Sequence, residues 1–409
     1  MSLCRYLPTP SDRMAAMWTL LTVKDAVVLE YGPSGTTHYC MGLFGSLGID
    51  VKDNLFTTHM DEDDVVMGDV TRLEESIVEV DKNYKPKVIF VVPSAISSVI
   101  GTDMRGICYY MQDKVNARLL SLTGGGLKGD YTVGLIDAYN LLAEEMAESD
   151  NTRREKTYNI LGASAGSFRI ASDIWELDDL MNRAFDAERI SVFGYSSSVD
   201  EIMTSGQASV NLVIRAEALP AAKLMEEKFG IPYVYGAPYG YSGTSNWLKS
   251  VSECMGVQIN MKAMAKLKEK EMETMQYRRY ISMYDNPPTA SISGDYDTII
   301  GLRGFMMSLG LKVDSMICSH SMRNIENPDP EIKNYAVEKE RLDILRGLKN
   351  QIILADDVSL YVCDKSNTKL CVSFPFIHHS QVAEHLPLMG ERGADFIMES
   401  VKGYFRDLD

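Results

Sequence analysis

Cysteine is scarce in this sequence, and no two cysteines have the Cys-x-x-Cys spacing. The seven cysteines are Cys4, Cys40, Cys108, Cys254, Cys318, Cys363 and Cys371. Their odd number and wide spacing argue against zinc ribbons, thioredoxin-like motifs and ferredoxin-type clusters. The start of the chain also lacks the basic and then apolar pattern of a secretory signal. We therefore expect reduced thiols, mostly in the core, and a cytoplasmic location.

An excess of positive charge and long apolar runs are also missing. Lys and Arg total 41 against 57 Asp and Glu, so the formal net charge is −16. This balance predicts no nucleic-acid partner and no binding to an anionic membrane. No apolar run reaches the ~18 residues that a membrane helix needs. The 409 residues, 45% of them hydrophobic, instead predict a soluble globular protein of two or three domains.

Short apolar, β-branched runs alternate with helical patterns along the whole chain. The runs are continuous, as in strands that are buried on both faces of a sheet. The expected strands are Ala26–Leu29, Val88–Val92, Ala117–Leu122, Tyr158–Leu161, Arg189–Phe193, Val210–Ile214, Tyr233–Tyr235, Ala290–Ile292, Lys312–Ile317, Gln351–Leu354 and Leu370–Phe374. The expected helices are Thr132–Glu148, Leu219–Phe229, Ser245–Met255, Asn260–Arg279, Tyr296–Leu309 and Glu331–Leu348. This alternation predicts an α/β fold with parallel sheets.

Two polar breaks divide the alternation into three units. A charged run at 149–156 precedes a fresh strand, and Tyr284–Pro288 ends a long helix. We therefore predict three Rossmann-like domains, residues 1–151, 152–286 and 287–409. Ligands of such sheets bind at the carboxyl ends of the strands, which places a ligand cleft between the units.

Several motifs resemble binding sites without completing one. The glycine-rich segments Thr123–Gly129 and Leu161–Ser167 follow strands, but neither is a Walker A loop or a dinucleotide fingerprint, so we interpret both as turns. The acidic run Asp61–Asp64 suits the amino end of a helix better than a cation site. His378, His379 and His385 lack metal-site spacing, and no nucleophile elbow occurs. The sequence names no catalytic acid, base or nucleophile.

Several segments, taken in order, are similar to one known family. They are Cys4, Tyr31–Thr36, Tyr84–Ile89, Ser94–Asp103, Asn211–Tyr233, Gly294–Leu302, Phe374–His379 and Gly390–Ala394. Together they resemble the nitrogenase component 1 family, which includes the molybdenum–iron protein, and its β-type subunits in particular. The resemblance spans nearly the entire chain. It implies three Rossmann-like domains around a shared cleft.

The resemblance also implies an iron–sulfur cluster at a subunit interface, held by cysteines of both chains. Of the three ligand positions expected here, Cys4 alone is a cysteine, because the other two are Thr36 and Ala95. Cys40, four residues after Thr36, is a candidate replacement ligand. Tyr31 stands where the family has a histidine. The candidate metal ligands are therefore Cys4 and Cys40.

A candidate cofactor or ligand site combines Tyr31, Thr36, Arg215 and Tyr239 at the expected strand ends. Arg215 is a cation suited to hold a carboxylate or phosphate, and the tyrosines of the 235–242 loop would supply flat apolar walls. The alternative is that Arg215 forms an ion pair with Glu217 and side chains fill the cleft.

Three functions remain open at this point. The first is an oxidoreductase subunit that acts on a small molecule, with an α-like partner or a second copy and an ATP-dependent iron–sulfur reductase. The second is a non-catalytic cofactor-assembly scaffold or carrier, and the third is a cleft-type small-ligand-binding protein. The missing cysteines favour the second and third, whereas the extent of the resemblance favours the first.

Overall fold

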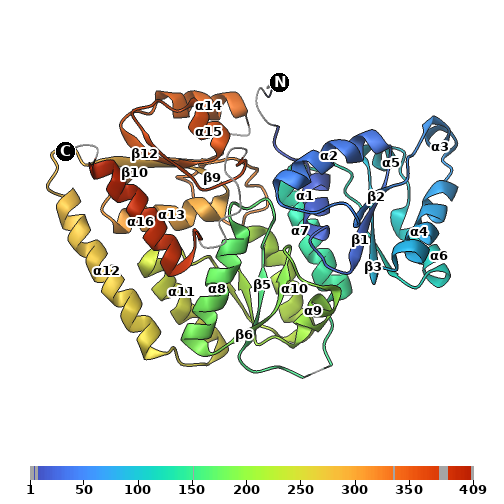
Figure 1. Cartoon of the computed structure of the whole chain (residues 1–409), viewed down its shortest axis with the longest axis horizontal. Coiled ribbons are helices and arrows are strands. Elements are labelled where there is room, and N and C mark those ends of the chain that lie inside the picture. Colours follow the sequence, from blue (N-terminus) through green and yellow to red (C-terminus); the bar gives the residue numbers. More distant parts are fainter. Residues whose placement is uncertain (1–3, 5–7, 151, 335–336, 377–385, 407–409) are drawn as a thin grey trace.

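The computed structural model describes residues 4, 8–150, 152–334, 337–376 and 386–406. Its architecture is α/β, with three separate sheets whose strands all run parallel, flanked by helices (Figure 1). The prediction of an α/β fold with three parallel sheets is confirmed. The three histidines His378, His379 and His385 lie outside the described residues.

The first sheet has the strand order β2-β1-β3-β4. Its strands are β1 (Ala26–Tyr31), β2 (Leu55–Thr57), β3 (Val88–Pro93) and β4 (Arg118–Ser121). All six residues of β1 and of β3 are buried. These two strands are central and covered on both faces, which explains why their sequences are apolar without alternation.

The second and third sheets repeat this arrangement. The second has the order β6-β5-β7-β8 and the third the order β11-β10-β9-β12-β13. The strands of the second sheet are β5 (Thr157–Leu161), β6 (Glu188–Phe193), β7 (Val210–Val213) and β8 (Tyr233–Tyr235). Those of the third are β9 (Thr289–Gly294), β10 (Lys312–Cys318), β11 (Lys333–Asn334), β12 (Gln351–Ala355) and β13 (Thr368–Cys371). Each sheet is thus made of strands from one predicted unit, while the unit boundaries themselves stay a prediction.

Helices connect the strands and cover the sheets. In the first unit they are α1 (Asp12–Leu20), α2 (Ser34–Ser46), α3 (Glu62–Met67), α4 (Thr71–Tyr84), α5 (Ala95–Val99), α6 (Met104–Met111) and α7 (Tyr131–Leu141). In the second they are α8 (Ile170–Phe185), α9 (Val199–Met203), α10 (Leu219–Phe229), α11 (Gly240–Met255) and α12 (Met261–Ile281). In the third they are α13 (Tyr296–Ser308), α14 (Glu338–Gly347), α15 (Asp357–Val362) and α16 (Gly390–Arg406). No helix in these described ranges is both long and apolar enough to cross a membrane.

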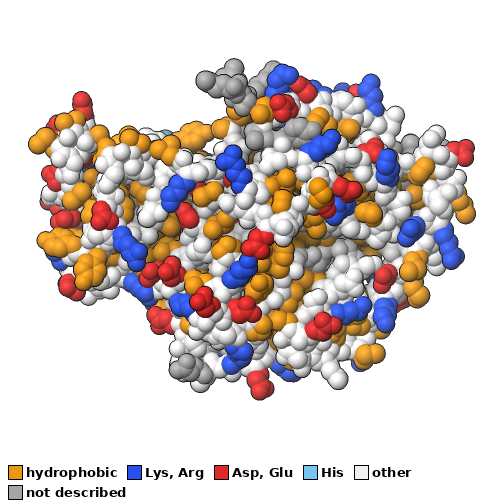
Figure 2. All heavy atoms as spheres, turned by 180° about the vertical axis from the view of Figure 1, so that it is seen from behind, with side chains coloured by type: hydrophobic (Ala, Val, Ile, Leu, Met, Phe, Trp, Pro, Cys, Tyr) orange, Lys and Arg blue, Asp and Glu red, His pale blue; other side chains and the backbone are white. Residues whose placement is uncertain are grey.

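The hydrophobic core is shared among the three units. One large cluster includes side chains of all three sheets, such as Val28, Ile160 and Ile292. A second cluster fills the other face of the first sheet, between β1, β3, α4 and α6. On the face drawn in Figure 2, cationic and anionic side chains are interspersed, without a large field of one sign.

Several segments differ from the sequence-based expectation, which contains neither the strand β2 nor the long helices α8 and α16. The predicted helix Glu331–Leu348 is wrong in its first part, because Lys333–Asn334 pairs with Ile317 and Cys318 as an edge strand and the helix begins at Glu338. Ile332 is buried between the exposed Glu331 and Lys333, so the described residues before the helix do not form a helical face. The C-terminal helix α16 packs against α8 and α11 of the middle unit. This contact joins the end of the chain to the middle unit.

The predictions for the glycine-rich segments and for the acidic run are confirmed. Thr123–Gly129 and Leu161–Ser167 lie in the connections that follow β4 and β5. The acidic run begins α3, where Asp61 accepts a hydrogen bond from the Asp64 amide and Asp64 from the Asp61 amide. These carboxylates satisfy amide groups that the first turn of a helix leaves free.

Candidate functional site

The turn after β1 and the turn after β3 lie side by side at the carboxyl edge of the first sheet. Tyr31 pairs in register with Pro93, so the chain leaves both strands at the same level. Gly32 is required at this crossing, because a Cβ atom there would lie 2.4 Å from the Cβ of Ser94. The structure therefore brings together the segments 31–36 and 94–103, which the sequence resemblance had placed at one site.

The side chains of these turns are occupied by local contacts. Tyr31 is fully buried, and its hydroxyl donates to the carbonyl of Asp69 at 3.1 Å. Burial, followed by the nearby carboxylates of Asp64 and Asp69, raises the pKa of Tyr31. The Thr36 hydroxyl donates to the carbonyl of Pro33 at 2.8 Å, and Ala95, the first residue of α5, offers no ligand atom.

Cys40 lies on the buried face of α2, in a polar cluster. Its Sγ accepts a hydrogen bond from Nη2 of Arg13 at 3.3 Å. Nη1 of Arg13 forms an ion pair with Glu30, whose other carboxylate oxygen accepts from the Thr37 hydroxyl. Cys40 and Glu30 are both fully buried. Burial raises the pKa of the Cys40 thiol, and Arg13 opposes this only in part.

Cys4 has a different environment. It is exposed, and its Sγ donates to a carboxylate oxygen of Glu338 at 3.4 Å, at the beginning of α14 in the third unit. Among the residues that the structure describes, no group of three or more His, Cys, Asp or Glu is placed to hold a metal ion. The thiolates that an iron–sulfur cluster needs are therefore not assembled by this part of the chain alone.

Arg215 lies at the carboxyl end of β7, in the junction between the middle and third units. It is 7% exposed. Its Nε and Nη2 donate to the two carboxylate oxygens of Glu217 at 3.1 and 3.0 Å, and Nη1 lies 3.4 Å from Oδ1 of Asp295. Burial by itself would lower the pKa of Arg215, but these carboxylates outweigh it and raise the pKa. The ion pair with Glu217, one of the two open interpretations, is thus present.

Two carboxylates of the third unit complete this cluster. Asp295 begins α13, where it accepts hydrogen bonds from the amide and the hydroxyl of Thr298 at 3.1 and 2.9 Å. Asp297 accepts from the Ala216 amide at 2.9 Å and from the Tyr235 hydroxyl at 2.6 Å. Burial and then the Glu217 carboxylate raise the pKa of Asp297 to about 6. Three carboxylates around one guanidinium leave the cluster without surplus positive charge.

Tyr239 lies in the same junction. It is 6% exposed, and its hydroxyl is 3.3 Å from that of Thr298. A cavity of about 20 Å³ separates Tyr239 from Arg215, and another of about 30 Å³ lies between Tyr131 and Phe374. Each is large enough for one water molecule at most.

Packing closes the junction where all three units meet. The Trp18 ring lies 6.2 Å from Tyr131 and 6.1 Å from Phe374, and its indole N–H donates to Ser164. The predicted cleft at the strand ends is therefore filled by side chains across the described residues. A cavity of about 770 Å³ lies elsewhere, beside α8 and α12.

Several residues of these clusters were not singled out as site candidates from the sequence. Glu30 carries a visible signal, because it is an acid inside the apolar run of β1. Asp295 and Asp297 follow β9 directly, which marks them as strand-end polar groups. His320 has no such signal. Its Nε2 accepts from the Tyr296 amide at 3.1 Å and its Nδ1 lies 3.0 Å from the Ser321 carbonyl, a pattern that fits a neutral ring protonated at Nδ1.

Comparison with known proteins identifies similar sequences. The chain is 31% identical over 243 residues to the nitrogenase iron-molybdenum cofactor biosynthesis protein NifE of Clostridium pasteurianum, a match to 59% of this chain and 52% of that protein. A NifE of Methanococcus maripaludis is 27% identical over 367 residues, which cover 86% of this chain and 75% of that protein. The first match thus spans about half of its relative's length.

A solved structure shares the fold. Nitrogenase Cp1 at pH 6.5 superposes with a TM-score of 0.83 at 16% identity, covering 100% of this chain and 94% of the other. The model of the nitrogenase component 1 type oxidoreductases matches residues 11–405. The predicted resemblance is confirmed at the level of the family, while the β-type assignment stays a prediction. The chain therefore belongs to the nitrogenase component 1 type oxidoreductase family.

Proposed function

We propose that the chain is a cofactor-assembly scaffold or carrier of this family rather than a catalytic subunit. The observation that carries the proposal is the edge of the first sheet, where Thr36 and Ala95 stand at positions that the resemblance assigns to cysteines and Cys40 is buried against Arg13. Such an edge suits a protein that holds a metal group transiently and with ligands from another chain. The printed function of the relatives, cofactor biosynthesis, supports the same conclusion.

A partner subunit or a second copy is part of this proposal. Exposed apolar side chains lie along α2 and α5, the helices that carry Thr36 and Ala95. Tyr39 is 67% exposed and Val99 73%, and Met41, Ile96 and Ile100 are each more than a third exposed. Exposed apolar groups next to one another commonly mark a subunit interface. We propose that a partner covers this edge and supplies most of the metal ligands, with Cys4 as the contribution of this chain.

Iron analysis of the chain expressed alone under anaerobic conditions tests the proposal. We expect iron well below the roughly four atoms per chain of a complete cluster. Co-expression with its partner should raise the bound iron, and Cys4→Ala should reduce that gain. Cys254→Ala, which alters a half-buried cysteine on α11, is the matched control. A stable cluster in the chain alone, lost in Cys40→Ala, would refute the proposal and make Cys40 a ligand.

A catalytic role is the second candidate. The match of the oxidoreductase family model to residues 11–405 favours it, since nearly the whole architecture is retained. In this role the chain would be an oxidoreductase subunit that receives electrons from an ATP-dependent iron–sulfur reductase. Reduction of a small substrate by the purified complex, dependent on that reductase and on ATP, would support this function over the scaffold.

A cleft ligand held by Arg215 is the third candidate. Binding would require the guanidinium to exchange Glu217 or Asp295 for an anionic ligand. Tyr239 lines the same small cavity as Arg215, whereas the Tyr31–Thr36 turn lies at the edge of the first sheet and does not line it. Titration of carboxylated ligands against wild type and Arg215→Met tests it. Equal affinities would remove Arg215 as the anchor, whereas a loss of about 10-fold or more would support it.

A further inference from the structure

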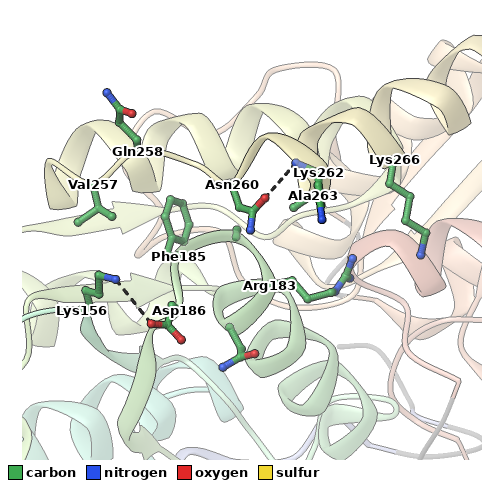
Figure 3. A pocket seen from close by; sticks show the side chains of 12 residues that line it. Lys156, Arg183, Phe185, Asp186, Val257, Gln258, Asn260, Lys262, Ala263 and Lys266 are labelled. Atoms are coloured by element: carbon green, nitrogen blue, oxygen red, sulfur yellow. Dashed lines mark hydrogen bonds and ion pairs between the residues drawn. The ribbon is translucent and has the colours of Figure 1, made fainter.

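A cavity of about 770 Å³ opens between the carboxyl end of α8 and the amino end of α12 (Figure 3). Its volume is in the range of small-ligand sites. Lys156, which precedes β5, and Asp186, which precedes β6, lie at one side of it. The cavity is therefore at the amino ends of β5 and β6 in the middle unit, away from the predicted cleft at the carboxyl ends of the strands.

The lining of this cavity is cationic in an acidic protein. Lys156, Arg183, Lys262 and Lys266 line it, with Asp186 as the single carboxylate. In Figure 3 Arg183 extends from α8 and Lys266 from α12, and their charged ends converge at the same side of the cavity. The chain as a whole has a formal charge of −16, so this local composition is opposite to the general one.

The carboxylate that Arg183 and Lys266 share lies behind them, and Nε of Arg183 also pairs with Asp179, which does not line the cavity, at 2.8 Å. Nη1 of Arg183 and Nζ of Lys266 both contact Glu391, at 3.0 and 2.7 Å. The Glu391 side chain is 3% exposed, whereas those of Arg183 and Lys266 are 28% and 57% exposed. A ligand in the cavity therefore meets Arg183 and Lys266 and not the Glu391 carboxylate. Lys262 is exposed and forms no ion pair within the described part of the chain.

The two ends of the cavity differ in chemistry. Asn260 caps α12 by accepting the Lys262 amide at 3.0 Å, so the positive end of a 21-residue helix dipole lies beside the lysines. At the other end, Lys156 lies 3.7 Å from Asp186, whose side chain is 88% exposed. One end thus suits an oxyanion, and the other suits a hydroxyl or amino group.

We propose that this cavity binds a phosphate-bearing small molecule of about nucleotide size. Arg183, Lys262 and Lys266 would contact the phosphate, whose oxygens accept charge-assisted hydrogen bonds. Asp186 would accept a hydrogen bond from the organic part of the ligand. The site is independent of any metal group and of the scaffold proposal.

Calorimetric titration of the full chain with AMP and, separately, inorganic pyrophosphate tests the site. The variant Lys262→Glu reverses a ligand-facing charge, yet it places an acid in the first turn of α12, where the helix dipole favours it. Lys268→Glu makes the same change at an exposed position of α12 outside the cavity. We expect saturable binding to wild type and to Lys268→Glu, and binding at least about 10-fold weaker to Lys262→Glu.

The two probes separate the sources of affinity. Tighter binding of AMP than of pyrophosphate would support a contribution from the Asp186 end, and equal binding would support recognition through the phosphate alone. Binding should also weaken as salt is added, because exposed charges are screened. Absence of saturable binding with both probes, or the same affinity in Lys262→Glu and wild type, would overturn the proposal.

Discussion

Arg13 and Arg215 are buried arginines, and each is paired with at least one buried carboxylate. Arg13 of α1 pairs with Glu30 of β1, and Arg215 pairs with Glu217 and Asp295. A buried charge is tolerated only when it is paired and hydrogen-bonded. At the residue scale, these pairs therefore hold the first helix on the first sheet, and the middle unit on the third.

Removal of Arg13 should be strongly destabilising. Arg13→Met leaves the fully buried Glu30 without its cation, so we expect a loss of about 3–5 kcal/mol in the free energy of unfolding, measured with urea. Arg72→Met is the control, because Arg72 pairs with Asp61 and Asp64 at the surface and its side chain is 39% exposed. There we expect about 1 kcal/mol or less. Equal losses in both variants would contradict this account of the buried pair.

Asp173 should make stability depend on pH. Burial raises its pKa to about 7, although the amides of Leu388 and Met389 donate to it. Its pKa in the unfolded chain is about 3.9. Between these two values the folded state binds the proton more tightly, so this group makes the protein less stable as pH rises from about 4 to about 7.

Asp173→Asn removes this titration and keeps an acceptor for the two amides. The free energy of unfolding of the variant, minus that of wild type, should therefore increase between pH 5 and pH 8. Urea denaturation of both proteins at several pH values measures the difference. A difference that stays constant over this range would contradict the role of Asp173.

At the element scale, side-chain caps and close helix contacts position the helices. The helices α3, α5, α6, α7, α9, α12, α13 and α15 each begin at an Asp, Ser or Asn whose side chain accepts a backbone amide of the first turn. These caps satisfy amides that would otherwise lack partners. The position of a helix beginning is therefore a local property, whereas its docking depends on what its surface contacts.

The two glycines of α13 should respond to alanine in opposite ways. A Cβ atom at Gly301 would lie 2.0 Å from the Tyr239 ring, so Gly301→Ala should be destabilising and should separate α13 from the beginning of α11. At Gly304 nothing lies within 4 Å, so Gly304→Ala should stabilise the protein by about 0.5–1 kcal/mol through helix propensity. Thermal unfolding of both variants measures the contrast. Stabilisation by both alanines would contradict this, because it would show that the Tyr239 ring moves aside without a loss of free energy.

At the scale of the whole molecule, three parallel sheets share one core, and the N-terminal unit carries the exposed apolar edge that we assign to a partner. Obligate interfaces bury more than ~2,000 Å² and are strongly apolar. The edge formed by α2 and α5 has the exposed apolar side chains of such an interface and carries Thr36 and Ala95, where the sequence resemblance predicts cluster ligands.

The chain expressed alone should form a homodimer through this edge. Sedimentation at micromolar concentration should give twice the chain mass of 45.7 kDa, and Val99→Asp should shift the protein toward the monomer. Met275→Asp, at a 59% exposed methionine of α12, should leave the dimer intact. A monomeric wild type, or dissociation caused by Met275→Asp instead of Val99→Asp, would contradict the assignment.

The sequence alone was sufficient for the fold class, for eleven of the thirteen strands in the described residues and for long helices such as α10 and α12, but not for α8 and α16. Continuous apolar runs such as Val88–Val92 and the periodicity of Leu219–Phe229 are local signals of burial, and α10 has the predicted bounds. The family resemblance was also visible in the sequence, because it rests on short turn segments such as Tyr31–Thr36. The close crossing of two backbones there requires a glycine, Gly32. The short edge strands β2 and β11 were not predicted, since two or three residues carry no periodicity.

The tertiary structure decided how the candidate site residues are used. Arg215 was identified from the sequence, but its contact with Asp295 joins residues eighty positions apart and depends on which strand ends meet. Cys40 was identified as a possible ligand, while its burial against Arg13 follows from the packing of α1 under α2. Local patterns report whether a side chain is buried, but the partner of a buried charge or thiol is a long-range contact, which only the folded chain determines.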